Sequence, residues 1–208
     1  VLKFGGTSVG TIKKIKRVVK IIISYKKRNY KIIVVSSAMS GVTNELIKKS
    51  FEISDSFAES EHDVLVSSGE QVACSLIAGR LIHDGHEARS WLSWQIPILT
   101  KGKYKNSRIN QINKINIIKY LKKGGIPIVT GFQGLNDENR ITTIGRGGSD
   151  ATAIMIAKFF KAKRCIIYTD VEGVYTTDPN KLKNAKKIKV ISYEEMLELS
   201  LIHISEPT

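Results

Sequence analysis

The sequence predicts a single α/β domain whose parallel or mostly parallel sheet is covered by helices. Short β-branched runs alternate with amphipathic stretches along the 208 residues, a pattern typical of strands joined by crossover helices. The chain is long enough to bury one core. Its content of 42% hydrophobic and 25% charged residues is that of a soluble globular protein. No repeat, low-complexity tract or interdomain linker divides it.

The first half of the chain alternates in this way. Apolar residues at helical spacing predict helices, which cover 11–27, 42–50 and 71–82. Apolar or β-branched runs between polar residues predict strands, which cover 1–4, 32–35 and 88–91. Gly85 is expected to end the third helix.

The second half continues the alternation. Ile112, Ile115, Ile118 and Leu121 recur at three-residue steps and predict a helix over 110–123. Further helical periodicity covers 151–160, and strand-like runs cover 126–130 and 164–169. The polar run 136–139 predicts a hairpin tip. A capping box formed by Ser192 and Glu195 predicts the start of a last helix.

The net charge of +14 allows two interpretations. One is nucleic-acid binding, in which a basic face neutralises phosphates. The other is a compositional bias toward lysine. We favour the bias, because the lysines are scattered along helix faces without aromatic neighbours and Lys far outnumbers Arg, the residue that base recognition favours. We therefore expect no nucleic-acid partner, although the charge can attract an anionic nucleotide.

The cysteine content and the hydropathy of the sequence indicate where in the cell the protein is expected. Cys74 and Cys165 are too few and too far apart for a disulfide framework, which favours a reducing cytoplasm. No apolar run approaches the roughly 20 residues that span a bilayer, so we expect no membrane partner. The four histidines show no zinc spacing with the cysteines, so no metal ligands are predicted. No Gly-x-Ser-x-Gly elbow supports acyl chemistry.

A glycine pair directly follows the first predicted strand, in Lys3-Phe4-Gly5-Gly6. Glycine lets the backbone approach a phosphate and adopt a positive φ, and exposed N–H groups then bind the anion. Lys3 would add a positive charge. A plain strand-to-helix turn explains the pair equally well. The spacing of a Walker A loop is absent.

The run from Gly145 to Asp150 is more specific. Arg146 suits forked recognition of a carboxylate, and the amides of Gly147 and Gly148 can form an anion nest. Asp150, at the start of a helix, is a cap, a partner that orients a lysine, or part of a metal–phosphate cluster. Together with the first glycine pair, this run implies two anionic groups held close together, as phosphoryl transfer requires.

Three other segments have a structural and a functional interpretation. The polar run 36–44 follows a buried strand, where open α/β sheets bind ligands, but it also suits helix capping. Glu70, in Ser67-Ser68-Gly69-Glu70-Gln71, is expected in the first turn of a helix, where it complements the dipole or binds an ammonium group. The run 168–179 is a strand-end turn or a loop around a nucleotide base and ribose.

Six blocks taken together resemble aspartate kinase, in the family's order and spacing. They are Lys-Phe-Gly-Gly-Thr-Ser-Val (3–9), Val-Ser-Ser-Ala-Met-Ser-Gly-Val-Thr-Asn-Glu (35–45), Ser-Gly-Glu-Gln (68–71), Gly-Phe-Gln-Gly (131–134), Thr-Thr-Ile-Gly-Arg-Gly-Gly-Ser-Asp (142–150) and Tyr-Thr-Asp-Val-Glu-Gly-Val-Tyr-Thr-Thr-Asp-Pro (168–179). Each block alone is weak evidence, but the set is specific and covers residues 1–199.

The resemblance implies the amino-acid-kinase fold, a three-layer α/β/α sandwich around a mostly parallel central sheet. It implies a cytoplasmic enzyme that transfers the γ-phosphoryl group of ATP, with Mg²⁺, to the side-chain carboxylate of L-aspartate. The product would be 4-phospho-L-aspartate, in the first step toward lysine, threonine and methionine. The parent enzyme would be a homo-oligomer, largely through its regulatory domains.

The resemblance also assigns residue roles. Lys3 and Asp150 match the catalytic residues. Arg146 matches the residue that grips the α-carboxylate of aspartate, and Glu70 the one that faces its α-amino group. Further substrate contacts fall on Ser37, Thr43, Gly147, Gly148 and Ser149. Nucleotide contacts fall on Lys3, Gly5, Gly6, Thr169, Asp170, Tyr175, Thr176, Thr177, Asp178 and Pro179.

The end of the chain departs from the family pattern. We expect 1–199 to be the catalytic domain, 200–208 to be a foreign junction, and the paired ACT regulatory domains to be absent from this chain. The departure replaces a lysine region that helps the family bind nucleotide, so the chain itself is expected to be weakly active or inactive.

Other functions stay open at this point. One is a sister kinase of the same fold that acts on acetylglutamate, glutamate or a nucleotide. Glu70 argues for an acceptor with a free ammonium group, which an N-acetylated or nucleotide acceptor lacks. The others are a basic nucleic-acid-binding module and a catalytically dead interaction domain.

Overall fold

The computed structural model describes residues 1–145 and 147–168. Arg146, the predicted nucleotide loop over 169–179, the capping box at Ser192 and the final segment lie outside the described residues.

Within the described residues, a five-stranded parallel sheet forms the centre of the fold. Its strands stand in the order β3 (Ala88–Trp91), β6 (Ile126–Thr130), β2 (Val34–Ser36), β1 (Leu2–Phe4) and β9 (Ile166–Tyr168). Each neighbouring pair is parallel. The carboxyl ends of all five strands therefore meet along one edge of the sheet.

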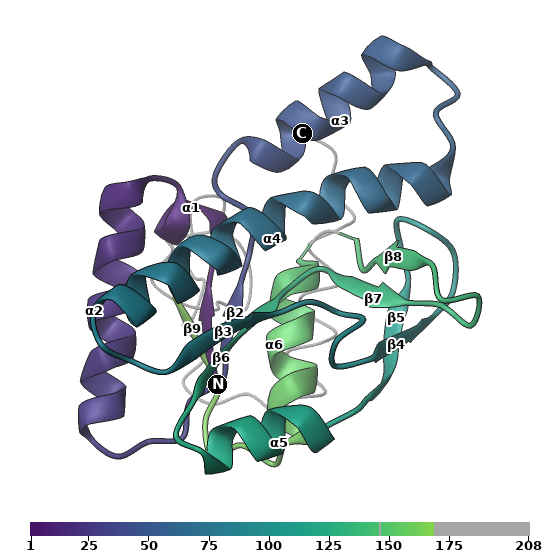
Figure 1. Ribbon diagram of the computed structural model, residues 1–208. Helices are drawn as coiled ribbons and strands as arrows, with labels where there is room; N and C mark the ends of the chain where they lie inside the picture. The colour runs from purple at the N-terminus through teal and green to yellow at the C-terminus, as the bar shows by residue number, and fades with distance from the viewer. Residues whose placement is uncertain (146, 169–208) are drawn as a thin grey trace, which may run out of the picture.

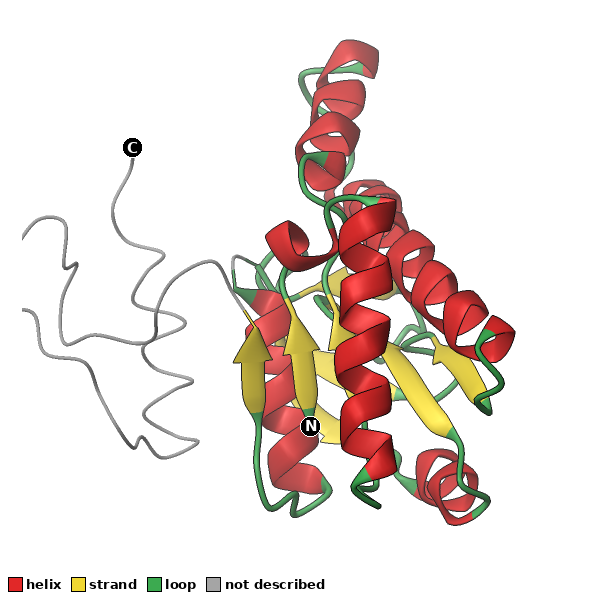
Figure 2. Ribbon diagram, turned by 90° about the vertical axis from the view of Figure 1, so that its left-hand side faces the viewer, coloured by secondary structure: helices red, strands yellow, loops and turns green. Residues whose placement is uncertain are grey.

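Helices cover both faces of this sheet (Figures 1 and 2), which confirms the predicted three-layer α/β/α sandwich. On one side, α2 (Ile12–Lys27) and α4 (Glu59–His83) pack over a core that includes Phe4 and Ile128. On the other, α5 (Ile115–Lys122) and α6 (Gly148–Phe159) enclose a core that includes Val35 and Val129. Burial on both faces explains the continuous apolar runs of the strands.

The short helix α1 (Gly6–Val9) follows β1 directly. The helix α3 (Val42–Ile53) and the adjoining part of α4 extend away from the central sheet in Figure 1. No helix in the described part of the chain combines the length and the apolar character needed to cross a bilayer.

A second, four-stranded sheet was not expected from the sequence. Its order is β5 (Arg108–Ile112), β4 (Ile98–Lys101), β7 (Gln133–Leu135) and β8 (Ile141–Thr143). Only β4 and β7 run parallel within it. The hairpin tip predicted at 136–139 is confirmed, because β7 and β8 flank it as an antiparallel pair.

The predicted helix over 110–123 was wrong at its start. Ile112 pairs with Ile98 in the second sheet, and the helix begins only at Ile115. The side chain of Asn113 accepts a hydrogen bond from the N–H of Ile115 at 3.0 Å, which satisfies one donor of the first turn. Ile112 is the buried last residue of β5, and its three-residue spacing from Ile115 only coincides with the spacing of a helix.

The predicted helix over 71–82 was too short, because α4 begins at Glu59. The Ser67–Gln71 run therefore lies inside the helix and does not open it, and Glu70 is not in a first turn. The hydroxyls of Ser67 and Ser68 donate to the carbonyls of Val64 and Leu65. These local bonds let two serines sit inside a helix.

Asp63 ties α4 to the second sheet. Its side chain is fully buried, and it accepts hydrogen bonds from the N–H of Lys105 at 2.9 Å, the N–H of Thr143 at 2.7 Å and the hydroxyl of Thr143 at 2.8 Å. Charge-assisted bonds of this kind are about twice as strong as neutral ones. The carboxylate thereby fixes the segment that leads from β8 into Gly145.

Replacing Asp63 with Asn should lower the free energy of unfolding by about 3 kcal/mol, because an amide offers one acceptor where three donors converge. Urea unfolding followed by circular dichroism measures the change. Glu59→Gln is the control, since Glu59 lies on the same helix but makes only an exposed ion pair with Lys105, and it should change stability by less than about 0.5 kcal/mol. Equal losses in the two variants would contradict the assigned role of Asp63.

Candidate active site

The loops at the carboxyl edge of the central sheet are joined by backbone hydrogen bonds. The N–H of Gly5 donates to Tyr168 O at 3.1 Å, the N–H of Ser37 to Phe4 O at 3.1 Å, and the N–H of Gly131 to Ser36 O at 3.0 Å. The ends of β9, β1, β2 and β6 are thereby held side by side. This edge is where open α/β sheets bind ligands.

Lys3 and Asp150 form an ion pair at this edge, with 2.6 Å between Nζ and the carboxylate. The side chain of Lys3 is 7% exposed and that of Asp150 is 29% exposed. Lys3 comes from β1, and Asp150 lies in the first turn of α6. Of the three interpretations of Asp150, this contact fits a partner of Lys3, and a role in a metal–phosphate cluster stays a prediction. The pair brings the two glycine-rich motifs into contact.

Close packing at the start of α6 makes this pair possible. A Cβ added to Gly131 would lie 2.6 Å from Ser149 Oγ, and one added to Gly148 would lie 2.8 Å from the ring of Phe132. No side chain fits at either glycine, so α6 can approach the end of β6. Gly145 and Gly147 adopt φ values of 79° and 70°, which favour glycine.

The amides at the two glycine motifs differ in availability. The N–H of Gly148 donates to Gly145 O at 3.0 Å, and that of Gly5 is taken by Tyr168. In this conformation neither N–H is open to an anion. The N–H groups of Gly6 and Thr7, at the start of α1, have no hydrogen-bond partner among the described residues.

The first glycine pair does not use a positive φ. Gly5 has a φ of −72°, and Gly6 is also outside the left-handed region. Gly6 is instead required for space, because an added Cβ would lie 3.0 Å from Ala38 O. The expectation of a positive φ at this pair was therefore wrong, and close backbone approach to a phosphate stays a prediction.

Glu70 reaches the same edge from the middle of α4. Its Oε1 accepts a hydrogen bond from the N–H of Ala38 at 3.0 Å, and its Oε2 is buried with no hydrogen-bond partner in the described structure. Burial raises the pKa of Glu70 to about 7, against a weaker opposing effect of the bond from Ala38. The free oxygen can accept a hydrogen bond from a ligand, and an ammonium group would favour its charged form.

Glycine and cysteine allow this approach of α4. A Cβ added to Gly69 would lie 2.8 Å from the Cβ of Ala38. One turn beyond Glu70, Cys74 is buried, and burial together with the nearby Glu70 raises the pKa of its thiol. Cys74 therefore stays a neutral packing residue beside the acid.

The other predicted substrate contacts are distributed around this edge. Ser149 is 8% exposed beside Gly131, half-buried Ser37 follows β2, and half-buried Thr43 lies in the first turn of α3. Together with Lys3, Gly5, Gly6, Glu70, Gly147, Gly148 and Asp150, these are the predicted site residues that the structure describes.

Sequence reasoning gave no role to Phe132 and Thr152. Phe132 has a φ of 68°, and its N–H donates to Thr152 Oγ1 at 3.1 Å, while that hydroxyl donates to Gly148 O at 2.7 Å. These bonds hold the end of β6 against α6. Strained non-glycine residues gather at functional sites, and the available signal was the Gly131–Gly134 block.

Comparison with known proteins identifies the family. A family model described as "Amino acid kinase family" matches residues 1–205. An aspartokinase of Rickettsia conorii is 50% identical over 203 residues, which are 95% of this chain and 50% of that protein. The chain thus spans about half the length of the curated relatives that it matches.

Solved structures agree with this assignment. An aspartate kinase from Synechocystis superposes with a TM-score of 0.78 at 37% identity, over 98% of this chain and 34% of that one. Aspartokinase III of E. coli, solved in complex with aspartate and ADP, superposes with a TM-score of 0.76 at 26% identity, over 90% of this chain and 52% of that one. The chain belongs to the amino acid kinase family.

Proposed function

We propose that the chain carries the catalytic centre of an aspartate kinase, which transfers the γ-phosphoryl group of ATP to the side-chain carboxylate of L-aspartate. The observation that carries this proposal is the ion pair between buried Lys3 and half-buried Asp150 at the strand edge, with an oxygen of Glu70 that has no partner among the described residues beside Ala38 at the same edge. Similarity to proteins named aspartokinase, at 50% identity to that of Rickettsia conorii, supports the choice of acceptor.

For this reaction the protein needs mainly to position the two substrates and to neutralise their negative charge. A carboxylate oxygen of aspartate attacks the γ-phosphorus, the bond to the β,γ-bridging oxygen breaks, and ADP leaves with that electron pair. An aspartate side chain with a pKa of about 4 is already ionised at neutral pH, so no general base is needed. Two anions must be brought together, and a preorganised cation provides most of the stabilisation.

Lys3 supplies that cation, and Asp150 holds it. Near the phosphoryl group, the ammonium of Lys3 would neutralise charge on the transferring oxygens. Asp150 fixes the direction of the Lys3 side chain through the 2.6 Å contact. The free N–H groups of Gly6 and Thr7 are suited to a phosphate oxygen.

Mg²⁺ fits this site as a companion of ATP. No group of three or more His, Cys, Asp or Glu side chains in the described residues could hold a metal ion, and Asp150 is the carboxylate that contacts Lys3, the proposed partner of the phosphates. Mg²⁺ is commonly held by one or two carboxylates together with substrate phosphates. When bound, it would neutralise phosphate charge.

Glu70 supplies the discrimination among acceptors. Its unpaired oxygen suits the α-ammonium of a free amino acid, and Arg146 would bind the α-carboxylate. The two would leave the side-chain carboxylate directed at the phosphate. Ser37, Thr43 and Ser149 would add polar contacts, with Gly147 and Gly148 beside them. The run from Thr169 to Pro179 would bind the nucleotide.

The wider assignment follows from the same proposal. Residues 1–199 would be the catalytic domain of a cytoplasmic enzyme in the pathway to lysine, threonine and methionine. Regulation and homo-oligomer formation would rest largely on ACT domains that lie beyond this catalytic unit, and residues 200–208 would not contribute to catalysis.

Acceptor choice tests the proposed function directly. Hydroxylamine traps an acyl phosphate as a hydroxamate, so incubation with MgATP should yield hydroxamate with L-aspartate and none above the blank with N-acetylglutamate. The assay is run on a full-length relative such as the Rickettsia conorii protein and on this chain, for which less product is expected because of the departure at residues 200–208. Product with acetylglutamate but not with aspartate from this chain would contradict the proposal.

Lys3→Ala should lower kcat by about 10³-fold, because it removes a preorganised cation from the transferring phosphoryl group. Asp150→Asn should cost about tenfold, since Lys3 keeps its charge but loses its partner. Lys26→Ala is the control, because Lys26 donates to Gly124 O at 2.7 Å away from this edge. A Lys3→Ala enzyme within about threefold of the parent would exclude Lys3 from the chemistry.

Glu70→Gln should flatten the dependence of stability on pH. The pKa of Glu70 is raised from 4.5 to about 7 on folding, so between these values the folded state holds more protons than the unfolded one. Its contribution to stability is complete below pH 4.5 and is lost as pH rises through about 7. Urea unfolding at pH 5 and pH 8 measures this loss, with the exposed Glu45→Gln as control. An unchanged pH slope in Glu70→Gln would contradict the raised pKa.

A further inference from the structure

A cavity of about 320 Å³ lies on the α5 side of the central sheet, outside the candidate active site. It opens where the edge strand β3 and the turn after it meet α5. The residues that line it are Arg89, Trp91, Gln95, Asn116, Lys119, Tyr120 and Lys123. Its volume is at the lower end of the range for small-molecule sites, and none of its residues belongs to the motifs above.

The lining holds more hydrogen-bond donors than acceptors, although the amide oxygen of Asn116 is an acceptor among them. The indole N–H of Trp91 is buried and has no partner in the described structure, on a side chain that is 5% exposed. A buried polar group without a partner is uncommon in native proteins. The side-chain oxygen of Gln95 already accepts from the N–H of Leu92 at 3.0 Å, which leaves its amide N–H groups as donors.

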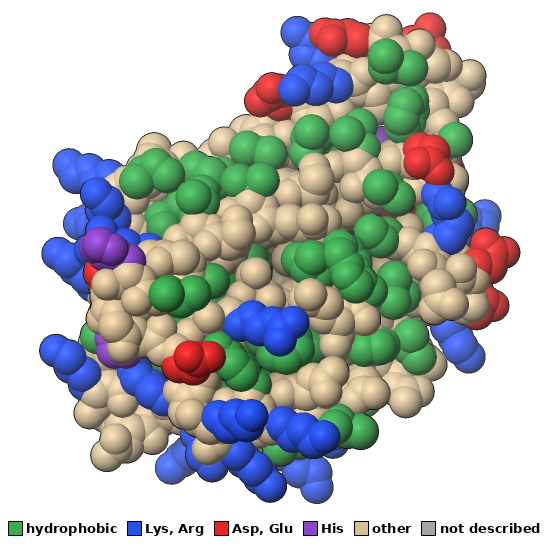
Figure 3. All heavy atoms as spheres, viewed as in Figure 1, with side chains coloured by type: hydrophobic (Ala, Val, Ile, Leu, Met, Phe, Trp, Pro, Cys, Tyr) green, Lys and Arg blue, Asp and Glu red, His purple; other side chains and the backbone are tan. Residues whose placement is uncertain are grey.

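Positive charge dominates the same cavity. Arg89, Lys119 and Lys123 make no ion pair with any acid in the described residues. The acid beside them, Glu87, accepts a hydrogen bond from the hydroxyl of Tyr120 at 3.0 Å. Figure 3 shows Lys and Arg side chains gathered over α5 at the lower end of this face.

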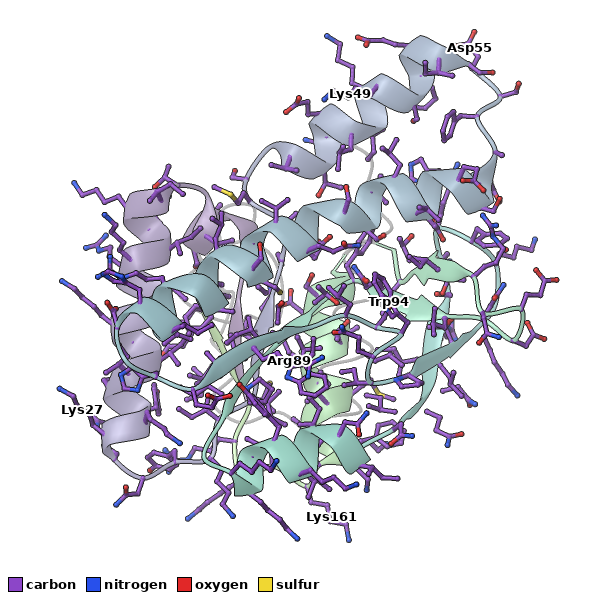
Figure 4. All side chains as sticks on the ribbon, viewed as in Figure 1. Lys27, Lys49, Asp55, Arg89, Trp94 and Lys161 are labelled. Carbon is purple, nitrogen blue, oxygen red and sulfur yellow. The ribbon has the colours of Figure 1, made fainter. Side chains whose placement is uncertain are left out.

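Aromatic contacts give the cavity a fixed wall. The guanidinium of Arg89 lies 4.2 Å from the centroid of the Trp91 ring, and the rings of Trp91 and Tyr120 meet edge to face at 5.6 Å. In Figure 4, Arg89 lies between β3 and α5. A stacked guanidinium loses little further freedom when it binds an anion, so this donor is preorganised.

Helix electrostatics alone do not account for the pattern. Lys119 and Lys122 both lie in the last turn of α5, where cations complement the helix dipole. Of these two lysines, only Lys119 lines the cavity. Lys123, the residue that follows the helix, also lines it. The helix dipole also does not explain why the indole N–H of Trp91 has no partner in the described structure. A ligand that brings acceptor oxygens would pair with the cations and would give the indole N–H a partner.

We propose that this cavity is a second ligand site, which binds a small oxyanion with two or more negative charges. Phosphate and carboxylate groups share this chemistry, since Arg binds either in a forked geometry and Lys binds either as a point charge. The ligand is smaller than a nucleotide, because the cavity is small and Arg89 covers the ring face that a base would stack on. The site is independent of the kinase function proposed above.

Intrinsic fluorescence provides the test, because the protein has two tryptophans. Trp94, which is 42% exposed, is changed to Phe so that emission reports Trp91. Lys3→Ala is added to suppress anion binding at the candidate active site. Pyrophosphate and succinate are titrated separately at constant ionic strength, with chloride as the balancing salt. We expect a saturable change in Trp91 emission with at least one of the two, and the arm that saturates tells phosphate from carboxylate.

Matched variants decide where the anion binds. Lys119→Ala should weaken binding by about tenfold, as expected for loss of one charge-assisted bond, whereas Lys122→Ala, on the same exposed helical turn, should stay within about twofold of the parent. Trp91→Phe keeps an aromatic ring but removes the indole N–H, and it should lose most of the anion-induced rise in Tm seen in the parent.

The proposal is overturned by any of three results. These are no saturable emission change with either anion, equal weakening by Lys119→Ala and Lys122→Ala, and a full anion-induced rise in Tm in Trp91→Phe. The Tm rise is measured relative to each variant's own ligand-free value, so a loss of stability in Trp91→Phe does not obscure the result.

Discussion

The structure of the catalytic edge depends on one buried ammonium group. Lys3 lies on a central strand with its side chain almost fully enclosed, and a buried charge is tolerated only when it is paired. Asp150 meets that requirement from α6. The need to bring α6 within reach of β1 then explains the small residues around it, because side chains at Gly131 or Gly148 would hold the helix away.

Two buried carboxylates on α4 show how partners separate structure from function. Asp63 receives hydrogen bonds from Lys105 and Thr143 on both of its oxygens. Its hydrogen-bonding capacity is therefore used within the protein, where it joins α4 to the second sheet. Glu70 receives one bond from Ala38, and its other oxygen has no partner in the part of the chain that the structure describes. A buried acceptor without a partner is unfavourable, and a cationic ligand removes that penalty. The length of α4 is what lets one helix carry both groups.

The edge of the sheet and the cavity beside α5 have one feature in common. In each place a buried polar atom has no partner among residues 1–145 and 147–168: a carboxylate oxygen at the first and an indole N–H at the second. In the proposed chemistry the carboxylate oxygen faces the α-ammonium group of the substrate. The indole N–H lies among cationic side chains. Complementary ligands of opposite sign follow from these donor and acceptor sets.

The sequence by itself determined the parallel sheet, most of its helices and the two motifs that meet at its edge, because hydrophobic spacing and glycine placement are local signals. Only the tertiary structure decided the second sheet and the length of α4. The strand containing Ile112 continues a helical spacing, and the serines of α4 look like a helix start, so neighbours distant in sequence had to settle both. The ion pair between Lys3 and Asp150 and the unpaired oxygen of Glu70 likewise exist only once strands far apart in the chain lie side by side.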